Sequence, residues 1–188
     1  MKNKIISVFN EKIRVIEDLK EQISLIVEIT NEIIKAYKNN KKLVLFGNGG
    51  SAADAQHIAA EFVGKFYKDR ESLPALAFHT NTSVVTAIAN DYGYDLIFER
   101  QVSSFVLEGD IAIGISTSGN SPNVIKGLEK AKAKGAVTIG LTGQKENKIE
   151  KIVAYCIKIP SVDTPRIQEG HITVGHIICY LVEQELFP

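Results

Sequence analysis

From Leu43 onward the sequence alternates short apolar runs with segments of helical periodicity, and this alternation constrains the fold more than any other feature. The runs expected to be strands are Leu43–Phe46, Ala75–Phe78, Ile111–Ile115, Ala136–Leu141 and Val153–Ile159. The segments expected to be helices are Ser51–Phe66, Ser83–Ala89, Tyr94–Val106, Asn123–Lys134 and Pro165–Leu186. Strands joined by helical crossovers favour a parallel sheet covered on both faces. The pattern therefore predicts an α/β fold, a three-layer, doubly wound, parallel five-stranded sheet of the flavodoxin-like or Rossmann-like kind.

Residues 1–40 form a separate pattern, because apolar side chains recur there at helical spacing from Phe9 to Tyr37. About thirty residues of helix would be about 45 Å long, more than a small domain easily covers. We expect one domain, 1–188, with residues 1–40 as a helical oligomerisation segment and residues 41–188 as the α/β core.

Charge and cysteine content exclude several classes of protein. The 188 residues carry 22 basic and 22 acidic side chains and no basic cluster, so no nucleic acid partner is expected. Cys156 and Cys179 form no C-x-x-C pair and are expected to be reduced thiols. The apolar run near Met1 is too short for a signal peptide, and Ile172–Val182 is too short to span a bilayer. A cytoplasmic protein with no membrane partner is the expectation.

Four hydroxyls and a glycine follow the expected strand Ile111–Ile115, in the sequence Ser-Thr-Ser-Gly-Asn-Ser of residues 116–121. The helix expected to start at Pro122 offers free N–H groups and the positive end of its dipole, which favour an anion. Hydroxyl donors suit a phosphate monoester. The loop has no lysine and is not a nucleoside triphosphate loop. An ordinary turn with a helix cap remains the alternative.

A glycine-rich turn, Gly47-Asn48-Gly49-Gly50-Ser51-Ala52, follows the first expected strand. It matches G-x-G-x-x-A, so dinucleotide binding is one interpretation. The acidic residue that should end the second strand is missing, since Asp69 and Glu71 precede that strand. We expect no nucleotide cofactor and favour a tight turn that lets the backbone approach a sugar or phosphate.

Histidine and acidic side chains form the remaining candidate site. His57 and Glu61, four residues apart, share one face of a helix and could bind a metal or exchange protons, or could be a solvated pair. His176 lies in an apolar run, where it could also be a satisfied core residue. His171 is about 140° away from it on an ideal helix, so the two are not expected to serve one site. His171 and His79 are expected to be structural or exposed, and Cys179 a packed thiol.

These motifs together resemble the bacterial phosphoheptose isomerases, which are single-domain members of the sugar isomerase (SIS) superfamily. The resemblance rests on segments spread over nearly the whole chain: Asn48–Ser51, His57–Glu61, Asn90-Asp91, Ser116–Ser121, Arg166–Glu169 and His176. The resemblance implies conversion of sedoheptulose 7-phosphate to D-glycero-D-manno-heptose 7-phosphate. This is the first step towards the heptose of lipopolysaccharide or related surface polysaccharides. It also implies a homotetramer with active sites at subunit interfaces.

The resemblance assigns roles by position. Phosphate binding falls to Ser116, Thr117, Ser118 and Ser121. Sugar contacts fall to Asn48, Gly49, Gly50, Asn90, Asp91 and Gln168, with Ser51 beside them, and Glu61 also touches substrate. The family's zinc ligands, one ion per subunit, correspond to His57, Glu61, Gln168 and His176.

The chemistry of the residues agrees with these roles. Aldose–ketose isomerisation moves a proton between C1 and C2 through an enediol and needs a base and an acid, for which Glu61 and His176 are the expected pair. Gln168 and His176 are about 12 Å apart along a continuous helix. Both reach one ion only if their side chains converge, if the helix starts after Gln168, or if another chain supplies one ligand.

Alternatives to the isomerase remain open. A non-catalytic SIS module that senses sugar phosphates or associates with replication initiators would need the phosphate loop but not Glu61 and His176 together. An amino-sugar isomerase or etherase is a further possibility, although such proteins usually have a second domain or other catalytic segments.

Overall fold

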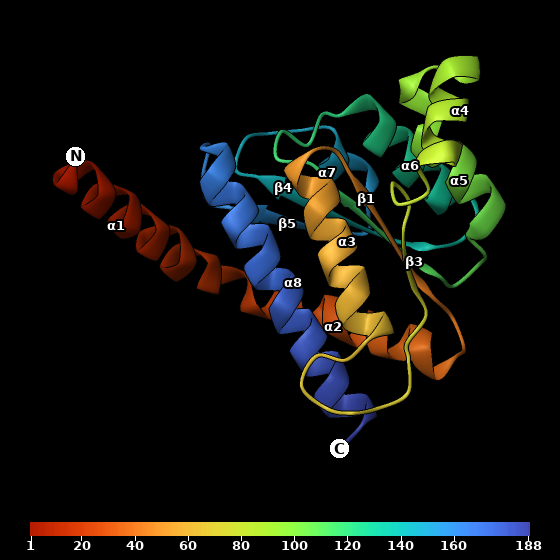
Figure 1. Ribbon diagram of the computed structural model, residues 1–188. Coiled ribbons are helices and arrows are strands. Elements are labelled where there is room, and N and C mark those ends of the chain that lie inside the picture. The colour runs from red at the N-terminus through yellow and green to blue at the C-terminus, as the bar shows by residue number, and fades with distance from the viewer.

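The computed structural model describes all 188 residues as a three-layer α/β structure with a projecting N-terminal helix (Figure 1). Its helices are α1 (Lys2–Leu19), α2 (Ile23–Lys38), α3 (Gly50–Val63), α4 (Thr82–Tyr92), α5 (Ile97–Phe105), α6 (Pro122–Ala133), α7 (Ile149–Ile152) and α8 (Thr164–Leu186). Two 3₁₀ turns, η1 (Lys20–Gln22) and η2 (Tyr94–Leu96), lie between helices. The strands are β1 (Leu43–Gly47), β2 (Ala75–Ala77), β3 (Ile111–Ile115), β4 (Val137–Gly143) and β5 (Tyr155–Ile159).

All five strands are parallel, in the order β2-β1-β3-β4-β5. Alternate residues of the central strands therefore point to opposite faces, and both faces are covered. Leu43 and Leu45 of β1 pack in the core shared with α2, α3 and α8, whereas Val44 and Phe46 pack in the core shared with α5 and α6. The predicted fold class is confirmed.

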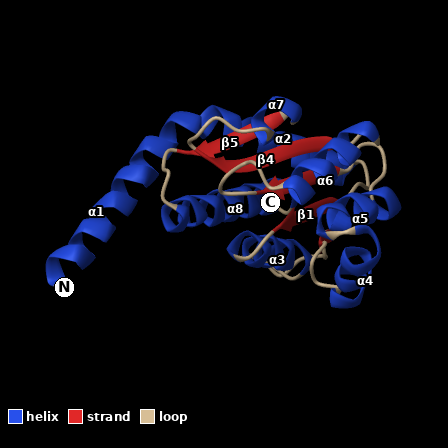
Figure 2. Cartoon of the chain, turned by 90° about the horizontal axis from the view of Figure 1, so that it is seen from above, coloured by secondary structure: helices blue, strands red, loops and turns tan.

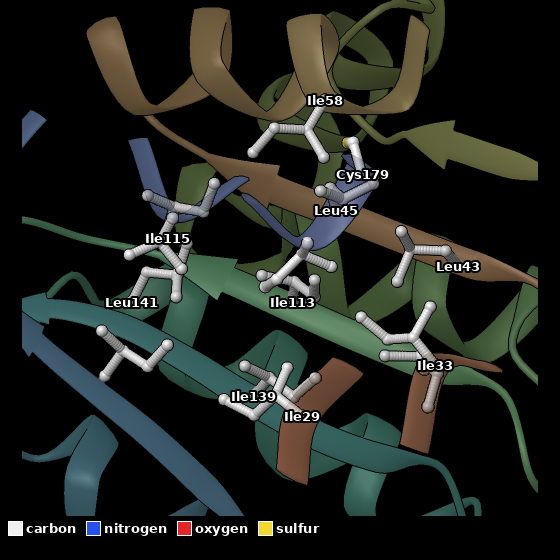
Figure 3. Packing of buried hydrophobic residues seen from close by; sticks show 14 of the residues in the cluster. Ile29, Ile33, Leu43, Leu45, Ile58, Ile113, Ile115, Ile139, Leu141 and Cys179 are labelled. Carbon is white, nitrogen blue, oxygen red and sulfur yellow. The ribbon is translucent and has the colours of Figure 1, made fainter. Parts of the chain in front are cut away.

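Branched aliphatic side chains fill the larger core (Figure 3). Ile29 and Ile33 of α2 pack there against β-strand residues such as Ile113 and Ile139, all four of them buried. β-Branched residues suit a pleated surface that is covered on both sides. This core holds α3 and α8 on the same face of the sheet as α2.

The N-terminal segment differs from the single helix that the sequence predicts. The 3₁₀ turn η1 separates α1 from α2, at the point where the Gln22 amide exchanges two hydrogen bonds with the backbone of Lys158 in β5. Only Val15 and Leu19 of α1 are buried, and the helix extends beyond the domain (Figures 1 and 2). The tertiary contact to β5 therefore coincides with the break in the helix.

Two other elements have different bounds from those predicted. Gly93, at φ +89°, ends α4. The predicted helix Tyr94–Val106 consists of the 3₁₀ turn η2 followed by α5, which ends at Phe105. The predicted strand Val153–Ile159 begins only at Tyr155, after the short helix α7. None of the helices is both long and apolar enough to cross a membrane.

Candidate active site

The order of the sheet places two loops at one position. The chain runs from β1 to β2 on one side and then continues with β3 on the other, so the topology switches between β1 and β3. Ligands of doubly wound sheets bind at such a point, outside the carboxyl ends of the strands. Gly47 and Ile115, the last residues of β1 and β3, are paired across the two strands. The glycine turn and the serine loop therefore leave the sheet side by side.

Hydroxyls of the serine loop converge. The Ser116 Oγ lies 3.3 Å from the Ser118 Oγ and 2.9 Å from the Ser121 Oγ. Ser121 is the N-cap of α6, and no side chain caps the free N–H groups of this helix start except the Asn123 oxygen bonded to Val124. Hydroxyl groups and a helix N-terminus together form an anion-binding arrangement. The sequence prediction for Ser116, Ser118 and Ser121 is consistent with this geometry.

Thr117 is held differently from its neighbours. Its carbonyl oxygen accepts a hydrogen bond from the Gly143 N–H at the end of β4, 3.1 Å away. Thr117 and Ser118 also border a cavity of about 280 Å³ that extends towards the residues following β4 and β5. The serine loop is thus anchored to β4 while part of it stays accessible.

The glycine turn leads into α3 and meets α8. A Cβ at Gly50 would lie 2.3 Å from the Gln168 Nε2, so only glycine lets that amide lie across the turn. Ser51, the next residue of α3, is buried, and Asn48 is half-buried. Gln168 therefore lies beside the glycine turn, within the continuous helix α8 that starts at Thr164.

Three side chains from two helices form a compact cluster. The His57 Nε2 lies 3.1 Å from the Glu61 Oε1 and 3.4 Å from the His176 Nε2. The three potential ligand atoms all lie within 4.8 Å of one another. Their neighbours explain the approach of the helices, because a Cβ at Gly175 would lie 2.6 Å from the Ile58 Cδ1. The absence of a side chain at Gly175 brings α8 against α3 and His176 against His57.

The cluster fits a zinc ion. Zinc–nitrogen and zinc–oxygen bonds of about 2.0–2.2 Å in a tetrahedron place neighbouring ligand atoms roughly 3.3 Å apart. The two separations that involve His57 are 3.1 and 3.4 Å, and all three ligand atoms lie within 4.8 Å of one another. Two imidazoles and a carboxylate are also a common zinc donor set. No hydrogen bond joins Gln168 to the three residues, so its role as a fourth ligand remains a prediction.

Burial sets the ionisation of two neighbours of the cluster. It raises the pKa of the Cys179 thiol to about 12, and the nearby Glu61 carboxylate adds to the effect. Cys179 is 2% exposed and belongs to the larger hydrophobic core, so it is a packed thiol, as the sequence predicts. Burial also raises the pKa of Asp54, one turn before His57, although the charge of His57 opposes that rise. Positive charge at His57 or a metal beside it thus favours the ionised form of Asp54.

Asn90 and Asp91 are the two expected substrate residues on α4. Both are exposed at the end of α4, where the Asn90 Nδ2 donates to the Asp91 Oδ1 at 2.8 Å. No hydrogen bond links them to the serine loop or the glycine turn within this chain. Their contact with a sugar stays a prediction that needs a ligand or a neighbouring subunit.

Two residues that the sequence analysis did not assign contribute to the site. Asn123 of α6 and Tyr94 of η2 both hydrogen-bond to the side chain of Asn48. No short motif contains them together with Asn48, because they are separated from it by 75 and 46 residues. Only the folded sheet brings these three side chains into contact.

The geometry defines an α/β protein with a hydroxyl-rich loop and a His–Glu–His cluster at the switch point of its sheet. A family model described as the SIS domain matches residues 8–143. A protein named phosphoheptose isomerase from Aneurinibacillus thermoaerophilus is 54% identical over 187 residues, covering 100% of this chain and 94% of that protein. The phosphoheptose isomerase of Aquifex aeolicus is 52% identical, with 98% and 97% covered.

A solved structure agrees with the sequence relatives. The phosphoheptose isomerase of Neisseria gonorrhoeae superposes with a TM-score of 0.92 at 37% identity, covering 97% of this chain and 98% of that one. The chain therefore belongs to the SIS domain family and, within it, to the phosphoheptose isomerases.

Proposed function

We propose that the chain is a cytoplasmic isomerase that converts sedoheptulose 7-phosphate to D-glycero-D-manno-heptose 7-phosphate, the first step towards a surface-polysaccharide heptose. The observation that carries the proposal is the His57–Glu61–His176 cluster beside a hydroxyl-rich loop at the β1/β3 switch point. The names of the relatives support the same activity. Two unpaired cysteines agree with a reducing compartment.

The proposed reaction is a proton transfer between neighbouring carbons. A base removes a proton from C1 of the ketose while the C2 carbonyl oxygen is protonated, which gives an enediol. A proton then leaves the C1 hydroxyl and one is returned to C2, which gives the aldose. Glu61 and His176 are the proposed pair, since their ligand atoms lie within 4.8 Å of each other, close enough to serve adjacent carbons and oxygens.

Zinc is the proposed cofactor, held by His57, Glu61 and His176, with Gln168 as the expected fourth ligand. A bound zinc ion would supply Lewis-acid stabilisation for negative charge on the substrate oxygens. His57 makes the shortest observed contacts to both of the other cluster members. Its proposed role is to hold the cluster in place and not to move the substrate proton.

The substrate phosphate is proposed to bind at Ser116, Thr117, Ser118 and Ser121. Three converging hydroxyls and the start of α6 favour an anion there. The sugar chain would then extend over the glycine turn, past Asn48, Gly49, Gly50, Ser51 and Gln168, towards Glu61. Asn90 and Asp91 complete the proposed sugar contacts.

A homotetramer with active sites at subunit interfaces is the proposed assembly. Two surfaces support it. Helix α1 exposes an apolar stripe that includes Phe9 and Ile13, 61% and 60% exposed. Helix α4 has no fully buried residue, since Val85 and Ile88 are only partly covered by the core beside α5 and α6, and Asn90 and Asp91 lie exposed at its end. Other subunits packed on these helices would bury apolar area and enclose the sugar-binding residues.

A non-catalytic sugar-phosphate sensor is the second candidate, supported by the serine loop alone. It would bind the same phosphate but would not need the His–Glu–His cluster. The two candidates are distinguished by proton exchange and not by binding.

The deciding experiment is NMR of sedoheptulose 7-phosphate incubated with the purified protein in D₂O, with and without added zinc. Stereospecific deuterium incorporation together with aldose formation is expected, and a dependence on zinc would identify the cofactor. Phosphosugar binding by a folded oligomer without exchange or product would instead support the sensor and would remove Glu61 and His176 from the proposed chemistry.

A further inference from the structure

The side-chain amides of Asn48, in the glycine turn, and Asn123, in the first turn of α6 after the serine loop, hydrogen-bond to each other in both directions. The Asn48 Nδ2 donates to the Asn123 Oδ1 at 2.9 Å, and the Asn123 Nδ2 donates to the Asn48 Oδ1 at 2.9 Å. Asn123 is 2% exposed, at the start of α6, whereas Asn48 is half-buried in the glycine turn. The buried Asn123 side chain thus joins α6, which follows the serine loop, to the glycine turn, which is expected to hold the sugar.

A backbone N–H group determines which way both amides point. The Val124 N–H donates to Asn123 at 2.9 Å, and because a backbone N–H can only donate, the Asn123 atom that it meets must be the oxygen. The other terminal atom of Asn123 is then the nitrogen, which requires an oxygen on Asn48. The orientation of the Asn48 amide follows from the fold of α6 and does not depend on solvent.

Tyr94 reinforces the same orientation from a third element. Its hydroxyl lies 3.1 Å from the Asn48 Oδ1, which therefore accepts two hydrogen bonds, one from Tyr94 and one from Asn123. An amide oxygen has two lone pairs, so that acceptor is filled. The Asn48 nitrogen uses one of its two N–H groups on Asn123. One N–H donor is left over, on a half-buried side chain in the glycine turn.

We propose that Asn123 and Tyr94 are positioning residues that hold the Asn48 amide so that it presents one N–H donor, and no acceptor, to an oxygen of the sugar phosphate. This inference rests on the proposed function for the identity of the ligand. If the Asn48 amide could flip by 180°, it would present its oxygen to the substrate in half of its orientations. That oxygen would repel a carbonyl, enediolate or phosphate oxygen. The fixed donor therefore suits a substrate whose oxygens gain negative charge.

A double-mutant cycle on kcat/KM tests the proposal. Asn123→Asp keeps the oxygen that accepts from Val124 but replaces the donor to Asn48 with an oxygen, at unchanged size. Alone, it should lower kcat/KM by at least about tenfold, whereas in an Asn48→Ala background its further effect should be less than about twofold. Tyr94→Phe should lower kcat/KM by about two- to fivefold, again only while Asn48 is present.

A matched control separates positioning from loss of stability. Gln101→Glu also places a carboxylate oxygen against a buried acceptor, since the Gln101 Nε2 donates to the Ile97 carbonyl oxygen at 2.8 Å in α5. It should lower Tm while leaving kcat/KM nearly unchanged. Equal losses from Asn123→Asp with and without Asn48, or no loss at all, would overturn the proposal. If Asn123→Asp does not fold, the exposed Tyr94 hydroxyl still supports the cycle with Tyr94→Phe.

The side-chain amide signals of Asn48 in ¹⁵N-resolved NMR give a readout that does not depend on catalysis. They are assigned by their loss in Asn48→Ala. In Asn123→Asp and Tyr94→Phe these signals should shift and exchange faster with solvent, whereas unmoved signals would refute the positioning role. A wild-type protein without turnover but with the expected shifts would contradict the proposed function and leave the amide geometry established.

Discussion

Glu61 is proposed both to act on a proton and to hold a metal, since its Oε1 lies 3.1 Å from the His57 Nε2 and it shares a cluster with His176. Glu61→Gln should leave the fold intact and lower kcat by at least about 10²-fold, as expected for lost acid–base catalysis. Steady-state kinetics, together with measured zinc content, would separate lost proton transfer from lost metal. Turnover near the wild-type value would remove Glu61 from the mechanism.

Ser118 differs from Glu61 in that it should affect binding more than chemistry. Its hydroxyl lies 3.3 Å from the Ser116 Oγ and accepts from the Asn120 N–H at 3.2 Å. Ser118→Ala removes one donor to the phosphate, so KM should rise by about five- to twentyfold with little change in kcat. Steady-state rates measured over a range of sedoheptulose 7-phosphate concentrations give both KM and kcat. An unchanged KM would place the phosphate elsewhere.

His171 has a structural role, which its complete burial makes plain. Its Nε2–H donates to the Thr142 carbonyl oxygen, 3.1 Å away, and burial lowers the pKa of the imidazole to about 4. The unfolded chain therefore binds a proton near pH 6.5 that the native state rejects. Stability from this residue is present above about pH 6.5 and is lost as the pH falls towards 4, by up to about 1.4 kcal/mol per pH unit.

The matched measurement is urea unfolding of the wild type and of His171→Gln between pH 7.5 and 4. The variant should start less stable and should lose less free energy of unfolding over that range. Parallel pH profiles of the two proteins would show that His171 is not the group responsible.

A buried ion pair joins the C-terminal end of α3 to α8, on the side away from the serine loop. Its partners are Arg70, in the loop that follows α3, and Glu183 of α8. The Arg70 Nε donates to the Glu183 Oε1 at 3.1 Å, and its other nitrogens donate to carbonyl oxygens of the last turn of α3, those of Glu61 and Phe62 among them. Arg70 thereby satisfies carbonyls that a helix C-terminus leaves without partners. The same guanidinium joins the helix of Glu61 to the helix of His176.

Breaking this pair should cost much more than breaking a surface pair. Burial opposes ionisation of Glu183, but N–H donors of Tyr67, Lys68 and Phe66, together with Arg70, outweigh it and hold the pKa of Glu183 below its usual value. Glu183→Gln should lower the free energy of unfolding by about 3–5 kcal/mol at neutral pH. The contribution is present above about pH 4.5 and is lost as the pH falls through the lowered pKa.

Chemical denaturation at pH 7 and pH 4 checks both statements. The exposed pair Lys20–Glu17 provides the control, and Glu17→Gln should change stability by less than about 1 kcal/mol. A loss from Glu183→Gln no larger than that of the control would mean that the Arg70–Glu183 pair does not stabilise the junction of α3 and α8.

For the molecule as a whole, the projecting α1 is the feature that a monomer does not explain. Phe9→Glu with Ile13→Glu places two charges on its exposed apolar stripe. Analytical ultracentrifugation should then show smaller species, down to the 20.7 kDa monomer, and activity should fall because interface-built sites come apart. Asn10→Glu with Arg14→Glu, on another side of α1, should leave the oligomer intact. A wild-type chain that sediments as a stable monomer would contradict the proposed assembly.

Features encoded within a few residues of one another could be predicted from the sequence alone. The apolar runs of β1 and β3, the serine loop and the i,i+4 pair of His57 and Glu61 need only local spacing to be recognised, since strands, turns and helix faces are set by short-range geometry. The parallel sheet followed from the alternation of such elements. Resemblance to a family then supplied His176 and Gln168 as partners.

Contacts between distant segments were decided only by the tertiary structure. The close approach of α3 and α8 at Gly175, the amide pair of Asn48 with Asn123, and the break in the N-terminal helix at Gln22 all depend on residues 75 or more positions apart. No local pattern encodes such pairs, because packing of whole elements against the sheet brings them together. The sequence determined which side chains are available for the proposed chemistry, and the folded sheet determined which of them meet.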